Sequence, residues 1–392
     1  MMISVNEAEE LIRINCIPSI IKGVKLEDAY NRVLAEDIIS PIHTPEHNQS
    51  AMDGYAMKYD ESLLHHPYTI IAEIQAGSDF HIDVKSSECV RIFTGAFVPE
   101  SCDTVIMQEK VERKKDKILL LDSQLKQGSN VRPQGSQSKQ GECVLKAGTL
   151  LRPAAIAFIA TLGISKVKVY AAPAIHLIIT GKELVKSGSV ALTGQVYECN
   201  SFGLKAALQA EHIYPDKVFY CDDRLDEIKA ALEQSMHKDI VVISGGISVG
   251  DYDFVAEALS LCGVDTIFYK VKQKPGKPIF FGKRNNTLVF ALPGNPASVL
   301  VCYYQYVLPV IKQMMNKEPG KLFTAPLQNS FKRKAGLTQY LKGFYSDDGL
   351  IILEDQNSYQ LNTFAVANCL IVLSEQCSEL KEGDILNYLP IN

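Results

Sequence analysis

The stretch that decides the fold is DIVVISGGISVGDYD, from Asp239 to Asp253. It begins with an apolar run and continues through three glycines and two serines between Ser244 and Gly250, ahead of a segment with helical spacing. Strands that lead through such turns into helices build parallel sheets covered by helices. Glycines let backbone N–H groups approach an anion, and a helix N-terminus adds a favourable partial charge. The stretch therefore predicts a phosphate-binding loop, with a plain tight turn as the alternative.

The same strand–turn–helix pattern is repeated on both sides of this stretch. Upstream, AIHLIIT (Ala174 to Thr180) is followed by a helix and by a strand near Val218. Downstream, an apolar strand ends in LPGNP (Leu292 to Pro296), from which a helix runs to Met315. These units predict a parallel sheet with helices on both faces, and ligands in such sheets bind at the carboxyl ends of the strands. The glycine loop matches neither a Walker A motif nor GxGxxG, so a nucleoside triphosphatase or dinucleotide enzyme is not supported.

The chain is predicted to contain several domains because 392 residues exceed one ordinary core. Short β-rich runs separated by turns fill residues 41–140 and return after Pro319. Two helices are predicted near the N-terminus, one capped by Ser4 with Glu7 and one from Leu26 to Ala35. The predicted fold is multidomain α/β plus β. A central αβα domain spans 174–318, a β-rich insert 41–140, a C-terminal β domain 319–392, and a discontinuous N-terminal domain 1–40 and 141–173.

Charge and cysteine usage exclude several classes of protein. Lys+Arg 40 against Asp+Glu 45 gives −5, so no global basic field is available for nucleic acid or an anionic membrane. No apolar run approaches the ~20 residues of a membrane-spanning helix, and the acidic N-terminus lacks the features of a signal peptide. The closest two of ten cysteines, Cys369 and Cys377, are eight apart, which fits neither a zinc knuckle nor a disulfide framework. A cytoplasmic protein with free thiols is expected.

Carboxylates gather at the predicted edge where the strands end. Thr180, Gly181 and Glu183 follow one strand, Asp222 and Asp223 follow the next, and Asp251 and Asp253 lie beyond the glycine loop. Hard oxygen ligands of this kind suit Mg²⁺ shared with substrate phosphates. Asp223 has an equal alternative as the N-cap of the following helix.

Two proline–glycine turns are further candidates. KPGKP (Lys274 to Pro278) carries two ammonium groups on a stiff backbone and suits an oxyanion, although a solvated turn is the alternative. LPGNP can shape the floor of the crevice and present Asn295, or make only a rigid turn. In the β-rich insert, SAMDGYA around Asp53 and RIFTGA around Thr94 are locally no more than turns at strand ends.

Taken together and in order, these segments resemble one family. NQSAMDGYA (48–56), RIFTGAFVPESCDTVIMQE (91–109), TGKEL, SGGISVGDYD, KPGKPIFFG and LPGNPAS are similar to the motifs of MoeA, the molybdopterin molybdenumtransferase family to which the C-terminal domain of gephyrin is related. The resemblance implies an elongated homodimer of four-domain subunits, with an αβα domain similar to molybdopterin adenylyltransferase and a barrel-like C-terminal domain. It implies that molybdenum from molybdate is inserted into adenylylated molybdopterin with release of AMP.

The resemblance also assigns roles to residues. Asp53 and Thr94 are expected to face the αβα crevice of the other subunit. The expected catalytic residues are Asp53, Thr94, Glu183, Asp222, Asp223, Asp253, Lys274 and Lys277. The expected molybdopterin-binding residues are Thr180, Gly181, Ser244, Gly245, Gly246, Ser248, Gly250, Pro293, Gly294, Asn295 and Pro296. The Mg²⁺ ligands are expected to be Glu183, Asp222 and Asp253.

Some positions depart from the family pattern. The acidic stretch that often follows Arg132 is absent, and Leu337 stands where the last domain commonly has arginine, so Lys342 or Arg333 is the candidate to replace that cation. Besides the homodimer, a molybdopterin adenylyltransferase and molybdoenzyme apoproteins or chaperones are possible partners. Two other functions stay open: the adenylyltransferase reaction itself, and a non-catalytic scaffold that binds a peptide.

Overall fold

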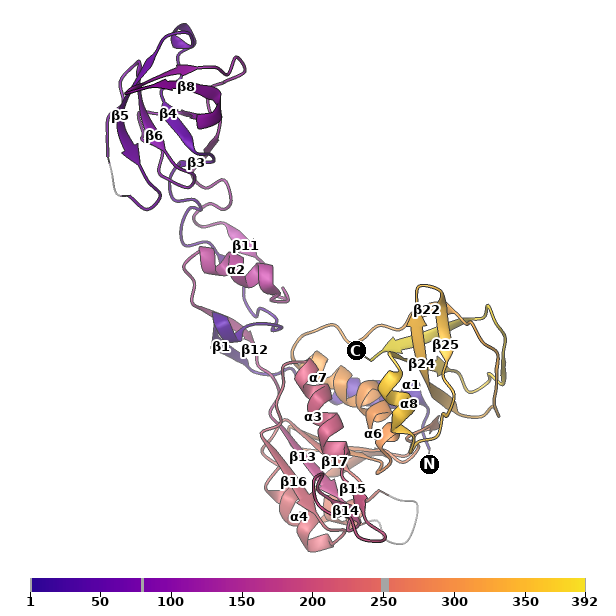
Figure 1. Cartoon of the computed structure of the whole chain (residues 1–392). Helices are drawn as coiled ribbons and strands as arrows, with labels where there is room; N and C mark the ends of the chain where they lie inside the picture. Colours follow the sequence, from indigo (N-terminus) through magenta and orange to yellow (C-terminus); the bar gives the residue numbers. More distant parts are fainter. Residues whose placement is uncertain (1, 79–80, 248–253, 392) are drawn as a thin grey trace. The chain divides into compact units, whose positions relative to one another are not determined.

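A computed structural model describes residues 2–78, 81–247 and 254–391 (Figure 1). The chain forms two compact units. Unit 1 comprises residues 1–22, 31–33 and 168–392, and unit 2 comprises residues 23–30 and 34–167. The predicted site residues Ser248, Gly250 and Asp253 lie outside the described residues. Within the described part, no helix is long and apolar enough to cross a membrane.

Unit 1 is built around a six-stranded sheet. Its strand order is β16 (Lys217–Cys221), β13 (Ile175–Thr180), β17 (Ile240–Ser244), β21 (Thr287–Leu292), β20 (Phe280–Arg284) and β18 (Asp265–Tyr269). The first four strands are parallel to one another, and β20 pairs antiparallel with β21 on one side and with β18 on the other. Every residue of β13, β17 and β21 is buried, which explains why these strands are almost continuously apolar.

Helices cover both faces of this sheet, as the alternation of side chains requires. Leu177 and Val242 pack in one core with α1 (Val5–Asn15), α3 (Asn200–Ala210) and α6 (Pro296–Cys302). Ile178 and Ile243 pack in the other with α4 (Leu225–Glu233) and α5 (Phe254–Leu261). The N-terminal helix α1, begun by Ser4, which accepts a hydrogen bond from the Glu7 amide, thus belongs to unit 1. The predicted αβα architecture is confirmed.

The helix predicted from Pro296 to Met315 is continuous but not uniform. After α6, a π-helical turn spans Tyr303–Val307 and α7 spans Leu308–Met314. Pro309 has no N–H to donate to the carbonyl of Gln305, so the regular hydrogen-bond pattern cannot pass through this point.

The C-terminal part of unit 1 is a small barrel. Its strands are β22 (Phe323–Pro326), β24 (Thr338–Ser346), β25 (Gly349–Ile352), β26 (Cys369–Leu373) and β28 (Ile385–Pro390). The hydrogen-bonded order β25-β24-β26-β28-β22 is closed by a bridge between Leu327 and Leu350, where the Gln328 amide donates to the Leu350 carbonyl at 2.8 Å. β19 (Gln273–Lys274) adds parallel to β24, β23 (Phe331–Lys332) pairs with β27 (Glu379–Leu380), and a short helix, α8 (Leu361–Val366), was not predicted.

Unit 2 holds a six-stranded sheet of its own. Its order is β7 (Thr104–Met107), β4 (Gly54–Met57), β6 (Glu88–Ile92), β5 (Tyr68–Ile74), β9 (Lys117–Leu120) and β8 (Val111–Lys114). The helix α2 (Pro153–Thr161) and the small ladders of β2 (Ile38–Ile39) with β11 (Cys143–Leu145) and β3 (Gln49–Ser50) with β10 (Val131–Arg132) complete it. β1 (Ile21–Lys25) pairs with β12 (Lys166–Tyr170).

The helix predicted from Leu26 to Ala35 is wrong. Only a 3₁₀ turn forms at Leu26–Asp28, and Asn31 has a φ of 59°, a left-handed conformation that a continuing helix does not contain.

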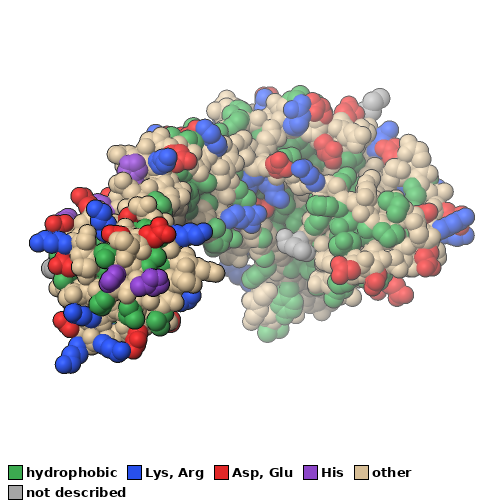
Figure 2. Space-filling model, turned by 90° about the horizontal axis from the view of Figure 1, so that it is seen from above, with side chains coloured by type: hydrophobic (Ala, Val, Ile, Leu, Met, Phe, Trp, Pro, Cys, Tyr) green, Lys and Arg blue, Asp and Glu red, His purple; other side chains and the backbone are tan. Residues whose placement is uncertain are grey.

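Figure 2 shows Lys and Arg side chains mixed with Asp and Glu over the viewed face, as expected of a chain with a net charge of −5.

Candidate functional site

Four strand ends meet at one edge of the central sheet. Thr180 pairs with Cys221, and Ser244 is level with both Ile179 and Leu292, so the parallel strands end together. The chain passes from β13 outward to β16 and then crosses to β17 on the other side of β13. Such a reversal of direction is where open α/β sheets bind ligands. We call this edge, between Thr180 and Leu292, the rim.

Two glycines follow β17 directly at the rim. Gly245 and Gly246 have φ values of +98° and +65°, which side-chain-bearing residues rarely adopt. A Cβ on Gly245 would overlap the carbonyl oxygen of Thr180, and a Cβ on Gly246 would lie 2.9 Å from the Thr180 Cγ2. Glycine is therefore required for the ends of β13 and β17 to approach each other.

Thr180 connects the ends of β13 and β16 through its hydroxyl. The side chain is buried, and its Oγ1 donates to the Oδ1 of Asp223 at 2.6 Å. The N-cap of α4 is Arg224, without a side-chain capping bond, so the alternative role of Asp223 as the helix cap is wrong. Asp222 is exposed, and its amide donates to the Glu227 Oε2 at 2.9 Å. Glu183, also exposed, lies three residues after Thr180.

Asn200 holds three segments of the rim together. Its Nδ2 donates to the Ser244 Oγ at 3.0 Å and to the Gly294 carbonyl at 2.8 Å. The Ser244 hydroxyl in turn donates to the Pro293 carbonyl at 3.5 Å. Thus the first residue of α3 ties the end of β17 to the turn after β21. Sequence reasoning missed Asn200, because an asparagine at a helix start ordinarily suggests only a cap.

The LPGNP turn is also tied to the C-terminal barrel. Asn295 donates from its Nδ2 to the Ser358 Oγ at 3.1 Å, and the Ala297 amide donates to the Ser358 carbonyl at 3.3 Å. The first turn of α6 therefore has its orientation set by a residue about 60 positions away along the chain. Ser358 is a second residue that sequence reasoning missed.

The KPGKP turn (Lys274 to Pro278), which we call the lysine turn, is anchored by a buried glutamine. Gln273 donates from its Nε2 to the carbonyls of Pro275 and Gly276, both at 3.1 Å, and accepts a hydrogen bond from the Tyr306 hydroxyl. A Cβ on Gly276 would overlap the Sγ of Cys302 in α6. The turn thus packs against the helix that begins at the rim, while Lys274 and Lys277 remain exposed.

In unit 2, the two predicted turns form one cluster. Both the amide and the Oγ1 of Thr94 donate to the Asp53 Oδ1, at 2.8 and 2.7 Å. These hydrogen bonds, with a smaller contribution from the charge of Arg91, hold the pKa of Asp53 below its ordinary value. Asp53 is thus held as a carboxylate with a fixed orientation.

The comparisons with known proteins cover nearly the whole chain. Residues 3–163 match the MoeA N-terminal region (domain I and II), 176–313 a probable molybdopterin binding domain, and 324–391 the MoeA C-terminal region (domain IV). A molybdopterin molybdenumtransferase of Haemophilus influenzae is 35% identical over 384 residues, which are 96% of this chain and 95% of that protein. The chain belongs to the MoeA family.

Other members of the MoeA family agree with this assignment. A molybdopterin molybdenumtransferase of a Nostoc species is 34% identical over 74% of this chain and 69% of its own. A crystal structure of a molybdopterin biosynthesis MoeA protein from Pyrococcus horikosii matches with a TM-score of 0.83 and 26% identity, and all of both chains is covered. The family resemblance and the fold class predicted from the sequence are confirmed.

The predicted metal ligands of this MoeA family member do not form a complete cage in the described residues. Within residues 2–78, 81–247 and 254–391, no three His, Cys, Asp or Glu side chains are grouped as metal ligands. Glu183 and Asp222 follow neighbouring strands at the rim, while Asp253 lies outside the described part. Mg²⁺ commonly takes only one or two protein carboxylates together with substrate phosphates, so two carboxylates fit that role.

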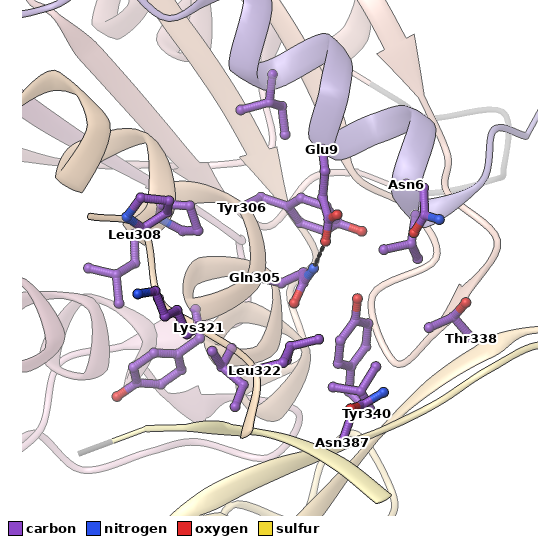
Figure 3. Close-up of a pocket in the computed structure, with 18 of the residues that line it drawn as sticks. Asn6, Glu9, Gln305, Tyr306, Leu308, Lys321, Leu322, Thr338, Tyr340 and Asn387 are labelled. Atoms are coloured by element: carbon purple, nitrogen blue, oxygen red, sulfur yellow. Dashed lines mark hydrogen bonds between the residues drawn. The ribbon is translucent and has the colours of Figure 1, made fainter. Parts of the chain in front are cut away.

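Unit 1 also contains a cavity that lies away from the rim. It has a volume of about 1010 Å³ and is lined by α1, by the helix around Gln305 and by barrel residues such as Tyr340 (Figure 3). Glu9 accepts a hydrogen bond from the Gln305 Nε2, and burial raises the pKa of the Glu9 carboxyl. None of the residues predicted for the rim lines this cavity, so its size does not make it the phosphate site.

Proposed function

We propose that this MoeA family member is a molybdopterin molybdenumtransferase, which inserts molybdenum from molybdate into adenylylated molybdopterin and releases AMP. The observation that carries the proposal is the rim. There the Gly245–Gly246 turn lies against Thr180 at the point where the strand order reverses, and Asn200 ties this turn to LPGNP. The molybdopterin molybdenumtransferases of Haemophilus influenzae and other bacteria support the same function.

The phosphate side of the nucleotide is proposed to bind at the turn after β17. The Gly245 amide already donates to the Leu292 carbonyl at 3.2 Å, so backbone N–H groups beyond Gly245 are proposed to supply the donors, and glycine allows the ligand to approach the backbone. Ser244 and Thr180 are buried and already bonded to Asn200 and Asp223, so their role is to fix the turn and the neighbouring carboxylate.

Molybdate is proposed to bind at Lys274 and Lys277. A doubly charged oxyanion is costly to hold without cations, and ammonium groups give charge-assisted hydrogen bonds. Gln273 holds the turn so that both lysines remain on its exposed side. Because the turn packs against α6, it is fixed relative to the LPGNP end of the rim.

Mg²⁺ is proposed to bind with the substrate phosphates at the carboxylates of Glu183 and Asp222. When bound, it would neutralise phosphate charge and favour departure of AMP. Asp223 is proposed to contribute through its Oδ1 bond to Thr180, which fixes its orientation. Asp253 is retained as a third carboxylate on the basis of the family resemblance.

A homodimer with a shared site is proposed as the active form. Four isoleucines close together in sequence, Ile14, Ile17, Ile20 and Ile21, are between 49% and 77% exposed, and exposed apolar surface commonly marks interfaces. Asp53 and Thr94 are proposed to complete the site of the other subunit.

All ten cysteines are free thiols, which favours the cytoplasm as the compartment.

The proposal is tested by incubating the purified protein with adenylylated molybdopterin and Mg²⁺, with and without molybdate, and separating the nucleotides by chromatography. AMP should accumulate only when molybdate is added. Tight binding of the pterin without AMP release at any molybdate concentration would instead favour a scaffold.

A further inference from the structure

A lysine of the C-terminal barrel is buried, and among the described residues no carboxylate forms an ion pair with it, although the charge of Asp355 acts on it from a longer distance. Lys342 in β24 is 3% exposed, and its Nζ donates to the backbone carbonyls of Asp355 at 2.6 Å, Gln360 at 3.1 Å and Asn357 at 3.3 Å. Lysine is almost never buried so completely unless its charge is compensated. Its three N–H donors are matched here by three carbonyls. The ammonium group is thus used entirely within the protein and is not available to a substrate.

The same segment is closed onto β24 by further hydrogen bonds. The Lys342 amide donates to the Gln356 Oε1, and the Gln356 Nε2 donates back to the Lys342 carbonyl, both at 2.9 Å. Gln356 also donates to the Leu353 carbonyl at 2.7 Å. Residues 353–360, which we call the strut, are therefore folded around Lys342.

Within the described residues, the strut hydrogen-bonds to the LPGNP turn and α6 through Ser358. Ser358 lies between Asn357 and Gln360, whose carbonyls Lys342 binds, and it contacts both Asn295 and Ala297. Loss of the ammonium group would release three carbonyls on both sides of Ser358. Asn295 and the first turn of α6 would then lose their fixed contact.

We propose that Lys342 is a positioning residue for the substrate site, and that it acts through Ser358 on the LPGNP turn. The inference rests on the proposed function of that turn. It also explains why Lys342 cannot replace the arginine that the family commonly has at position 337. Arg333, the other candidate, is occupied as well, because its guanidinium donates to the carbonyls of Leu337 and Cys377 and to the Gln339 Oε1.

Lys342→Met tests the proposal, and Arg333→Met is its matched control. Both substitutions remove a barrel cation that binds backbone carbonyls, but within the described residues the carbonyls bound by Arg333, those of Leu337, Ser374 and Cys377, make no hydrogen bond to the LPGNP turn. Calorimetry should show adenylylated molybdopterin binding about tenfold more weakly to Lys342→Met and normally to Arg333→Met, although both variants lose thermal stability. Equal affinity of Lys342→Met and the parent would overturn the inference while leaving the proposed function intact.

A double-mutant cycle tests the route through Ser358. If Lys342 acts through Ser358, adding Lys342→Met to Ser358→Ala should weaken binding less than it does in the parent. Independent, multiplicative effects would contradict the route.

Hydrogen–deuterium exchange gives a readout that needs no ligand and no activity. Amides of residues 295–300 should exchange faster in Lys342→Met and Ser358→Ala than in Arg333→Met. Unchanged exchange there would refute the coupling even if the parent failed to bind the pterin. Should Lys342→Met not fold, Lys342→Gln, which keeps an N–H donor but removes the ammonium charge, must still speed exchange at Ala297, and its failure to do so would overturn the proposal.

Discussion

Replacing Gly246 with alanine should damage the rim, whereas the same change at Gly263 should not. The two glycines have nearly identical φ values, +65° and +66°. A Cβ at Gly263 meets nothing within 4 Å, while one at Gly246 would lie 2.6 Å from the Val255 Cγ2 and 2.9 Å from the Thr180 Cγ2. Comparing the variants therefore separates backbone strain from the loss of space at the rim.

The loss of folding free energy in each variant can be estimated from these contacts. Both variants carry the cost of a left-handed alanine, about 1–2 kcal/mol. At Gly246, the Val255 side chain must also move by roughly 0.8 Å to reach the 3.4 Å of ordinary contact. This movement is difficult because Val255 and Thr180 are both buried and β-branched. Overpacking of this kind costs about 1–3 kcal/mol more. Each kcal/mol lowers the Tm of a folding unit of 150–250 residues by about 2–4 °C, so the unfolding transition of unit 1, which contains both glycines, should lie several degrees lower in Gly246→Ala than in Gly263→Ala.

Gly246→Ala should weaken ligand binding more than it lowers folding stability. Movement of Thr180 disturbs its 2.6 Å bond to Asp223 and shifts the turn that offers its N–H groups to phosphate. Losing one hydrogen bond to a charged group costs about 1.5–3 kcal/mol, which corresponds to roughly a tenfold to hundredfold weaker Kd. Calorimetry with adenylylated molybdopterin should show this loss for Gly246→Ala and parental affinity for Gly263→Ala. Equal affinities in the two folded variants would refute the phosphate-binding role of the turn.

Three further predictions concern the remaining groups of the site. Thr94→Val removes one hydrogen bond from the Asp53 Oδ1, so NMR titration should show a higher Asp53 pKa in the folded variant. A depressed carboxyl pKa stabilises the folded state above the ordinary value near 4, and this stabilisation is lost as the pH falls through the folded-state pKa. The loss should therefore start near the same pH in both proteins but be smaller, and complete at a higher pH, in the variant. Lys277→Gln should raise the molybdate concentration needed for half-maximal AMP release several-fold while nucleotide binding stays close to the parent's, and an identical molybdate dependence would count against the oxyanion role. Inactive Asp53→Ala and Asp253→Ala chains should regain activity when mixed, with about half of the sites restored in each heterodimer; verified heterodimers no more active than either parent would rule out a shared site.

The sheet and the glycine turn could be predicted because their signals are local. Strands such as β17 are buried on both faces and therefore appear as continuous apolar runs, and a Gly–Gly pair directly after such a strand marks a close approach of backbones. The helix predicted from Leu26 failed because helical spacing does not reveal that Asn31 adopts a left-handed conformation. The capping role of Asp223 failed because its hydrogen-bond partner, Thr180, comes from another strand.

The rest of the site could not be predicted because its contacts are distant in sequence. Asn200 joins Ser244 and Gly294, which are 44 and 94 positions away, and Ser358 joins Asn295 across 63. No local pattern distinguishes these side chains from an ordinary helix start or a polar loop. Asp53 and Thr94 are 41 positions apart, and from the sequence only the resemblance of their motifs to the MoeA family places them in one site.

The measurement that tests the central claim most directly is the ratio of AMP released to molybdenum retained by the pterin. The purified protein is supplied with adenylylated molybdopterin, Mg²⁺ and limiting molybdate, the nucleotide is quantified by chromatography, and molybdenum in the pterin-bound fraction is quantified by mass spectrometry. The account predicts one AMP for each molybdenum transferred, and no AMP when molybdate is omitted. Release of AMP without molybdate, or without molybdenum entering the pterin-bound fraction, would contradict it.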